Sequence, residues 1–183
     1  MNRYLPGIWA LALVPVFAAD PSAPPVGKIF DQQLSSAERE VVSLVEAMPA
    51  DKYNFAPTQG EFAGVRTFGQ QVSHVAAVIY ACSASVLGEK NPIDMGPQEN
   101  GPASLKTRDD ILKFLKDSIA YGHKALASVT DANVNEMVQS AFGKNQVPRL
   151  NMASVLGWHS MDHYGQMVVY ARMNGIVPPA SRR

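Results

Sequence analysis

The stretch Leu150–Met173 (LNMASVLGWHSMDHYGQMVVYARM) decides how this chain folds. Positions taken alternately four and three residues apart carry mostly large side chains, with His159 and His163 in the middle of the series. This period is typical of a helix that turns one face toward the interior of a bundle. The helix should end near Gly175, since a glycine followed by prolines is a usual stop pattern. The inward-facing positions are Met152, Leu156, His159, His163, Gln166, Tyr170 and Met173.

An earlier segment, from Thr67 to Gly88, has the strongest apolar character. Thr67 followed three residues later by Gln70 matches a capping box, which marks the start of a helix. After His74 the segment is apolar nearly all round, so it should form the most buried helix. Its inward-facing series places a histidine next to small residues, namely Gln71, His74, Val78, Ala81 and Ser85.

Two more helices are expected from the same period. One covers Leu34–Met48, with one of the two serines after Leu34 as its cap. The other opens with the capping pair Thr107 and Asp110 and ends near residues 126–129. A weakly helical piece is expected at residues 134–138, and no alternating pattern is long enough to indicate a sheet. The sequence therefore predicts an all-α four-helix bundle.

Residues 1–18 have the features of an export signal. Arg3 supplies a positive start, Leu5–Phe17 is apolar, and small residues follow at the expected cleavage point. We expect a Pro-rich linker at residues 19–27 and the bundle at residues 28–183. The apolar stretch is short and contains prolines, so we expect a periplasmic or secreted protein with no stable membrane span after cleavage. An uncleaved anchor or a buried N-terminal helix is the alternative.

Composition narrows the classes of partner. Lys+Arg and Asp+Glu both number 16, and no basic run offers the footprint that nucleic acid needs. We therefore expect no nucleic-acid partner. Cys82 is the single cysteine, so an internal disulfide is excluded, and its apolar surroundings predict a buried, inert thiol. The oligomeric state is left open, a homodimer included.

The segment Glu89–Leu105 is rich in Pro, Gly and Asn and contains no helical pattern. A connection of this length is often a lid or a binding loop. We expect it to be mobile and to lie over one end of the bundle. It can act as a lid only if it lies near the histidines.

Three of the four histidines occupy interior positions of the expected bundle. His159 and His163, four residues apart, lie on one helix face about one turn from each other. Buried imidazoles are costly without partners, and a metal ion bound by His74, His159 and His163 would supply one. Their ligand nitrogens should then converge to about 3–4 Å from one another. The alternative is that such pairs arise by chance and the three are ordinary core residues.

Two stretches resemble the DinB superfamily: Thr67–Ala76 (TFGQQVSHVA) and His159–Gln166 (HSMDHYGQ). That superfamily contains four-helix metal-binding proteins, among them metal-dependent transferases of low-molecular-weight thiols. The resemblance implies one metal ligand from the second helix, His74, and two from the last. Many members have a histidine where this chain has Asp162. That histidine is usually not a metal ligand, so the departure leaves the implied metal site intact and puts in question only a proton-transfer role at this position.

Three histidines leave at least one coordination position open, which favours catalysis or ligand binding over a closed structural site. Zinc, nickel or iron(II) would suit these ligands. We expect a metal-dependent transferase or hydrolase of an unknown small molecule, in which the metal is a Lewis acid or lowers the pKa of a bound water or thiol. The alternative is a metal- or small-ligand-binding bundle without turnover. Candidate general bases are Asp162, Glu89, Asp94 and Glu99.

The remaining polar and aromatic residues near these motifs receive simpler interpretations. Gln166, three positions beyond His163, is a candidate to support a metal ligand, with a role in packing as the equal alternative. Trp158 and Tyr164 are expected to fill the bundle. His123 is expected to be an ordinary surface or half-buried histidine, and Arg66 a solvated charge.

Overall fold

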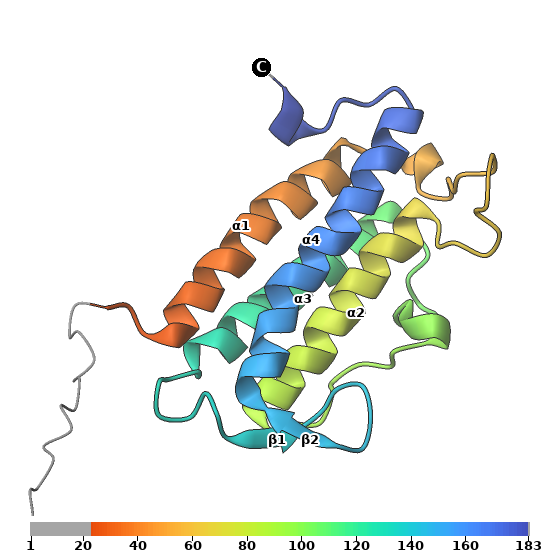
Figure 1. Ribbon diagram of the computed structural model, residues 1–183. Helices are drawn as coiled ribbons and strands as arrows, with labels where there is room; N and C mark the ends of the chain where they lie inside the picture. The colour runs from red at the N-terminus through yellow and green to blue at the C-terminus, as the bar shows by residue number, and fades with distance from the viewer. Residues whose placement is uncertain (1–22, 183) are drawn as a thin grey trace, which may run out of the picture.

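The computed structural model describes residues 23–182, so the predicted export signal and the first part of the linker lie outside the described residues. Four long helices and one small hairpin form the structure (Figure 1). The helices are α1 (Val26–Ala47), α2 (Phe68–Leu87), α3 (Arg108–Ala127) and α4 (Arg149–Met173). The strands β1 (Met137–Gln139) and β2 (Gln146–Pro148) pair antiparallel. Among the described helices, none has the length and apolar character needed to cross a membrane. The predicted four-helix bundle is confirmed.

The helices α1 and α4 run in one direction, and α2 and α3 run in the other (Figure 1). Helices α1 and α2 each pack on both α3 and α4 but not on each other, so α1 and α2 lie on a diagonal of the bundle. Because α2 and α3 are parallel neighbours, the chain between them must return along the length of the bundle. This return brings the loop past the middle of α2.

Helix α2 is the central element of the packing. Its capping box is present, with Thr67 Oγ1 accepting from the Gln70 amide at 3.3 Å and Gln70 Oε1 accepting from the Thr67 amide at 2.9 Å. Of its 20 residues 16 are buried, so the prediction that it is the most buried helix is confirmed. The helix ends at Gly88, whose φ of +70° is the left-handed conformation usual at a helix C-terminus. The capping box predicted for α3 at Thr107 is also present.

The core divides into two clusters of buried side chains along the bundle. One contains Phe68, Val72, Leu115 and Met167, and the other contains Leu34, Cys82, Leu126 and Leu156. Cys82 is fully buried, and burial raises the pKa of its thiol to about 12. The prediction that the thiol is buried is confirmed, and this setting argues against a nucleophilic role, because a nucleophilic cysteine needs a lowered pKa and exposure.

The start of the first helix differs from the prediction. Helix α1 begins at Val26, not at Leu34, and so takes in two residues of the expected linker. Ser35 lies inside the helix, where its hydroxyl donates to the Asp31 carbonyl at 2.8 Å, and it is not a cap. The extra turns are stabilised by packing, since Val26 and Phe30 lie against the second core cluster. Tertiary contacts of this kind are not visible in a local capping pattern.

The hairpin was also missed. Residues 134–138 are predicted to be weakly helical, but residues 134–136 form a turn and residues 137 and 138 belong to β1. Val138 pairs with Val147 and is buried against the bundle. Arg149 stabilises the turn, its guanidinium lying 2.8 Å from the Glu136 carboxylate. Strands of three residues are too short for alternation to reveal them.

Candidate metal centre

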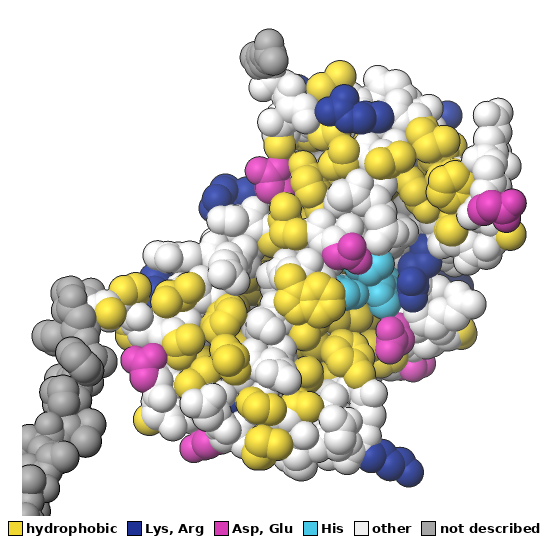
Figure 2. All heavy atoms as spheres, viewed as in Figure 1, with side chains coloured by type: hydrophobic (Ala, Val, Ile, Leu, Met, Phe, Trp, Pro, Cys, Tyr) yellow, Lys and Arg dark blue, Asp and Glu magenta, His cyan; other side chains and the backbone are white. Residues whose placement is uncertain are grey.

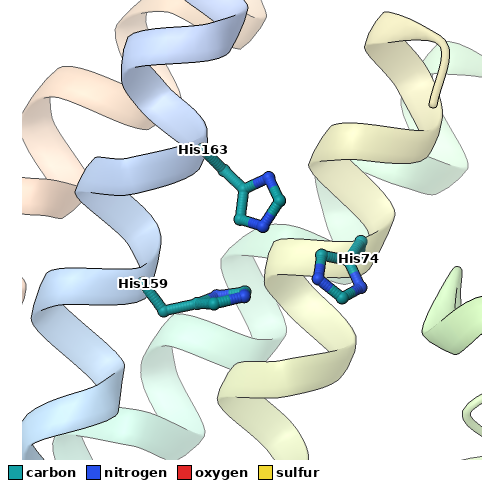
Figure 3. A group of neighbouring side chains, drawn as sticks. All are labelled: His74, His159 and His163. Carbon is teal, nitrogen blue, oxygen red and sulfur yellow. The ribbon is translucent and has the colours of Figure 1, made fainter. Parts of the chain in front are cut away.

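Three histidine rings meet between α2 and α4, near the middle of both helices (Figure 3). The ring centroids lie 4.5 Å apart for His159 and His163, 4.8 Å for His74 and His163, and 5.1 Å for His74 and His159. One nitrogen from each ring can be chosen so that all three lie within 4.8 Å of one another. This limit is slightly above the predicted separation of about 3–4 Å. The predicted meeting of the three residues is confirmed.

The orientation of the His74 ring follows from its contact with the loop before α3. Its Nδ1 lies 3.0 Å from the backbone carbonyl of Glu99. A carbonyl can only accept a hydrogen bond, so Nδ1 carries the proton and Nε2 keeps its lone pair. The Glu99 carboxylate is farther away, at 3.9 Å from the same nitrogen. This is the arrangement in which the second nitrogen of a metal-binding histidine is held by a backbone carbonyl.

His163 is held in the same way by an amide. Its Nδ1 bonds to Oε1 of Gln71, and Nε2 of Gln71 donates to Oε1 of Gln166 at 3.0 Å. The amide oxygen of Gln71 accepts, so Nδ1 of His163 is also protonated and its Nε2 is free. Gln166 therefore contacts His163 through Gln71, which is the first of the two alternatives given for this residue. The supporting role of Gln71 was missed, although its inward-facing position next to His74 was a usable signal.

His159 lacks such a partner. Within residues 23–182 its Nδ1 is one of only two buried side-chain nitrogen or oxygen atoms without a hydrogen bond, the other being Ser83 Oγ. An unpaired buried polar atom costs free energy and is rare in folded proteins. A set of three imidazoles, two with a free Nε2 and one unsatisfied, has the chemistry of a ligand set for a divalent transition metal. The residues present therefore fit a metal ion.

Electrostatics keep the three rings neutral. Burial, the largest cause, acts together with the charges of His163, His74 and Arg66 to lower the pKa of His159 to about 3. Burial, His74 and Arg66 bring the pKa of His163 to about 4, although Asp162 acts in the opposite direction. The pKa of His74 is also lowered, again chiefly by burial. Neutral imidazole is the form that binds metal, so this set is ready for an ion near neutral pH.

The loop Glu89–Leu105 reaches the histidines. It runs along the side of the bundle rather than over one end, which corrects the predicted position (Figure 1). Within it Gln98 and Glu99 have φ values of +55° and +59°. Left-handed backbone costs about 1–2 kcal/mol per residue for side chains other than glycine. Arg66 donates to the Gln98 carbonyl at 2.6 Å and to Asn100 Oδ1 at 2.7 Å, so it is not the solvated charge that was expected.

The four candidate acids lie in different surroundings. Glu89 accepts from Tyr121 and Lys124, and Asp94 accepts from the Gly96 amide. Both are therefore occupied with contacts away from the histidines. Asp162 lies next to the site, with its Oδ2 3.4 Å from Gln166 Nε2. Glu99 contacts the site through its backbone carbonyl, which accepts from His74, rather than through its carboxylate. Histidine side chains reach the surface between acidic and basic groups (Figure 2).

Three other predictions near the site have different outcomes. Trp158 is 57% exposed and borders a groove of about 640 Å³ between α1 and α4, so it does not fill the bundle. Tyr164 is half-buried, packs against the core and donates to Glu40 at 3.0 Å. His123 lies apart from the other three and is half-buried, which confirms its interpretation as an ordinary histidine.

A four-helix bundle with three neutral histidines between two of its helices defines a class of candidate metal-binding proteins. The sequence profile of the DinB superfamily matches residues 33–167, and the chain belongs to this superfamily. No protein of curated function matches the chain by sequence.

Solved structures show the same fold. A DinB-like protein from Bacillus cereus has a TM-score of 0.64 at 18% identity, with 83% of this chain and 95% of that chain covered. A DinB-like protein from Bacillus subtilis has a TM-score of 0.62 at 16% identity, with coverages of 85% and 99%. A conserved protein from Enterococcus faecalis has a TM-score of 0.61 at 13% identity, with coverages of 82% and 98%. At these identities the similarity concerns the fold alone.

Proposed function

We propose that this protein binds one divalent metal ion through His74, His159 and His163. The observation that carries the proposal is the approach of one nitrogen from each ring to within 4.8 Å of the others. Two further features support it: the protons on Nδ1 of His74 and His163 leave both Nε2 atoms free, and the buried Nδ1 of His159 has no hydrogen bond within residues 23–182. Zinc, nickel and iron(II) are the ions that such a donor set suits.

Three protein ligands leave room for a further ligand. Structural zinc sites usually have four protein ligands, whereas sites with three keep a position for water or substrate. When bound, the ion would supply Lewis-acid chemistry. The function proposed is therefore transfer or hydrolysis of a small molecule.

A small polar cavity adjoins the site. It has a volume of about 320 Å³ and is lined by Gly64, Val65, Arg66, Gln71, Gln98 and Gln166. Gln71 connects this cavity directly to His163. Its size and polar lining suit a small polar ligand better than a large apolar one. Asp162, joined to Gln166, is the acid best placed to exchange a proton with a ligand there.

Elemental analysis of protein purified from its native compartment tests the proposal. We expect one equivalent of a divalent transition metal, which a chelator removes and which rebinds on titration. The variant in which all three histidines are alanine should contain none, while His123→Ala should contain the full equivalent. Stoichiometric metal in the triple variant would exclude this site. If the protein binds metal but turns over no tested ester, amide or thiol, its function is metal or ligand binding, and the proposed transferase or hydrolase activity is wrong.

We also propose that the protein is exported and that the mature chain begins near residue 19. The positive start, the apolar stretch and the small residues at the cleavage point support this. Mass spectrometry of the native protein should give a mass without the first 18 residues. An intact Met1 on protein from the cytoplasm would contradict the proposal.

A further inference from the structure

The part of the loop that touches His74 is a closed turn, Met95–Gly101, which we call the strap. Its two ends are joined by a hydrogen bond from the Gly101 amide to the Met95 carbonyl at 2.8 Å. Gly96 and Gly101 both have positive φ, +64° and +81°. A Cβ atom on Gly96 would lie 2.0 Å from the Gly101 carbonyl oxygen, so only glycine allows this close approach. The strap therefore has a defined shape.

The middle of the strap is strained in a way that serves its contact with His74. Gln98 and Glu99 are consecutive, carry side chains, and are both left-handed. Strain of this kind persists only where surrounding contacts hold it, and it is concentrated at functional sites. Here the result of the strain is that the Glu99 carbonyl lies 3.0 Å from Nδ1 of His74.

Arg66 makes hydrogen bonds to the strap on both sides of Glu99. Its Nη2 donates to the Gln98 carbonyl at 2.6 Å, and its Nε donates to Asn100 Oδ1 at 2.7 Å. A planar guanidinium that makes two hydrogen bonds fixes direction as well as distance. The backbone of Arg66 is itself held, since its carbonyl accepts from Tyr170 of α4 at 3.1 Å. The arginine thus ties the strap to the same two helices that carry the three histidines.

We propose that Arg66 is a positioning residue for His74, acting through the strap. It holds the Glu99 carbonyl where it keeps the proton on Nδ1 of His74, so that Nε2 stays unprotonated toward His159 and His163. The proposal rests on the proposed metal binding for its purpose, but the positioning itself belongs to the metal-free protein.

Charge and position make opposite predictions for this residue. A guanidinium near a cation site repels the cation, and Arg66 lies close enough to lower the pKa of all three histidines. If Arg66 acted only through its charge, removing it would tighten metal binding. If it positions His74, removing it weakens metal binding. The direction of the change therefore separates the two roles.

The first test compares Arg66→Met with Arg108→Met by calorimetric titration of zinc or nickel into the chelator-treated protein. Arg108 is a matched control, because it also donates to a backbone carbonyl, that of Glu46 at 3.0 Å, and lies at a helix start. We expect Arg66→Met to raise the Kd for metal about 10- to 100-fold, as for other groups that orient a metal ligand. Arg108→Met should leave the Kd unchanged. An unchanged or lower Kd in Arg66→Met would overturn the proposal.

The second test reads the His74 ring without metal, by long-range ¹H–¹⁵N correlation in the labelled, metal-free protein. The wild type should show the Nδ1–H tautomer of His74, and Arg66→Met a mixture of the two tautomers. Arg66→Lys should restore part of the Nδ1–H signal. The lysine ammonium can reach one oxygen of the strap, but it cannot make both hydrogen bonds of the planar guanidinium at once. A His74 tautomer identical in all three proteins would overturn the positioning role. If the wild type binds no metal, the proposed function fails while this measurement still decides the inference.

A third variant serves if Arg66→Met does not fold. Gly96→Ala disrupts the close approach between Gly96 and the Gly101 carbonyl that closes the strap, and it leaves Arg66 in place. It should therefore produce the same loss of metal affinity and the same mixture of His74 tautomers. Where both variants fold, their combination should lose no more than either alone, because both act through one contact. Independent, additive losses, or a normal tautomer in Gly96→Ala, would contradict the strap as the connection.

Discussion

Two groups of histidine occupy this bundle, and their partners differ in kind. His123 of α3 lies between two carboxylates, with its Nδ1 2.6 Å from Asp31 and its Nε2 3.2 Å from Glu38. The three histidines of α2 and α4 are held by a carbonyl, by an amide, and in the case of His159 by no protein partner within residues 23–182. The two carboxylates around His123 favour the charged ring, in which both nitrogens carry a proton. The surroundings of the other three histidines favour the neutral ring, which keeps a lone pair on one nitrogen.

The pKa directions follow from these partners. Burial alone would lower the pKa of His123, but hydrogen bonds to Asp31 and Glu38 outweigh it and raise the pKa. For His159 and His163 burial acts without a carboxylate that directly bonds the ring, and their pKa values fall to about 3 and 4. A buried histidine whose Nδ1 bonds to a neutral carbonyl or amide oxygen is therefore a candidate metal ligand, whereas one whose nitrogens bond to carboxylates is an ion-pair partner.

The largest expected effect is on metal binding. His163→Ala should weaken metal affinity by at least about a thousandfold, because two histidines leave the ion underligated. His123→Ala should leave the affinity unchanged. The metal-free His163→Ala protein should keep its helical circular dichroism, since most of the core is aliphatic. Unchanged affinity in His163→Ala would remove the distinction between the two groups.

A smaller effect should follow from changing what supports the ring. Gln71→Leu removes the acceptor of His163 Nδ1 and should weaken metal affinity about 10- to 100-fold. The matched change at the other group, Asp31→Asn, should have no effect on metal affinity. Both can be measured by competition with a chelating dye. Equal affinities for Gln71→Leu and the wild type would show that the amide contact does not matter for binding.

The pH dependence of stability separates the groups without any metal. The folded pKa values of His159 and His163 lie below the unfolded value of about 6.5, so the unfolded chain binds more protons in that range. Their contribution is full above pH 6.5 and is lost as the pH falls toward 4. We expect the free energy of unfolding to decrease by on the order of 1–3 kcal/mol from this source, after allowance for partial solvent access. Urea titrations of the metal-free protein at several pH values check this, with a His159→Gln, His163→Gln variant expected to show a shallower slope.

The smallest effect concerns His123, and its sign is opposite. A raised folded pKa means that its ion pairs contribute fully below pH 6.5 and that this contribution is lost as the pH rises through the folded pKa. Because the pairs are partly exposed, the contribution should be at most about 1 kcal/mol. Asp31→Asn should lower the pKa of His123 in an NMR titration. An unaltered pKa would mean that the carboxylate pair does not control this ring.

Local sequence patterns were sufficient for some elements and insufficient for others. The capping boxes at Thr67 and Thr107 predicted two helix starts, because their hydrogen bonds involve only residues three apart. The start of α1 at Val26 was missed, since its first turns are stabilised by packing against distant parts of the chain. The hairpin was missed because its strands have three residues each.

The candidate site divides in the same way. The i, i+4 spacing of His159 and His163 and the inward position of His74 predicted that three rings would meet, and the structure confirms the meeting. The sequence placed Gln71 only as an inward-facing residue, because its role depends on Gln166, which lies 95 positions further along the chain. Arg66 was interpreted as solvated, because its partners Gln98 and Asn100 lie 32 and 34 positions further along. Whether the three histidines bind metal stays a prediction.

The sequence by itself determined the bundle and the histidines that share its interior, because helical periodicity places side chains on a face with only local information. Tertiary structure alone decided which nitrogen of His74 and which nitrogen of His163 is protonated. The carbonyl of Glu99 reaches His74 because α2 and α3 are parallel neighbours, which forces their connection along the side of the bundle. No spacing within a helix encodes that path, since it results from how the four helices are arranged.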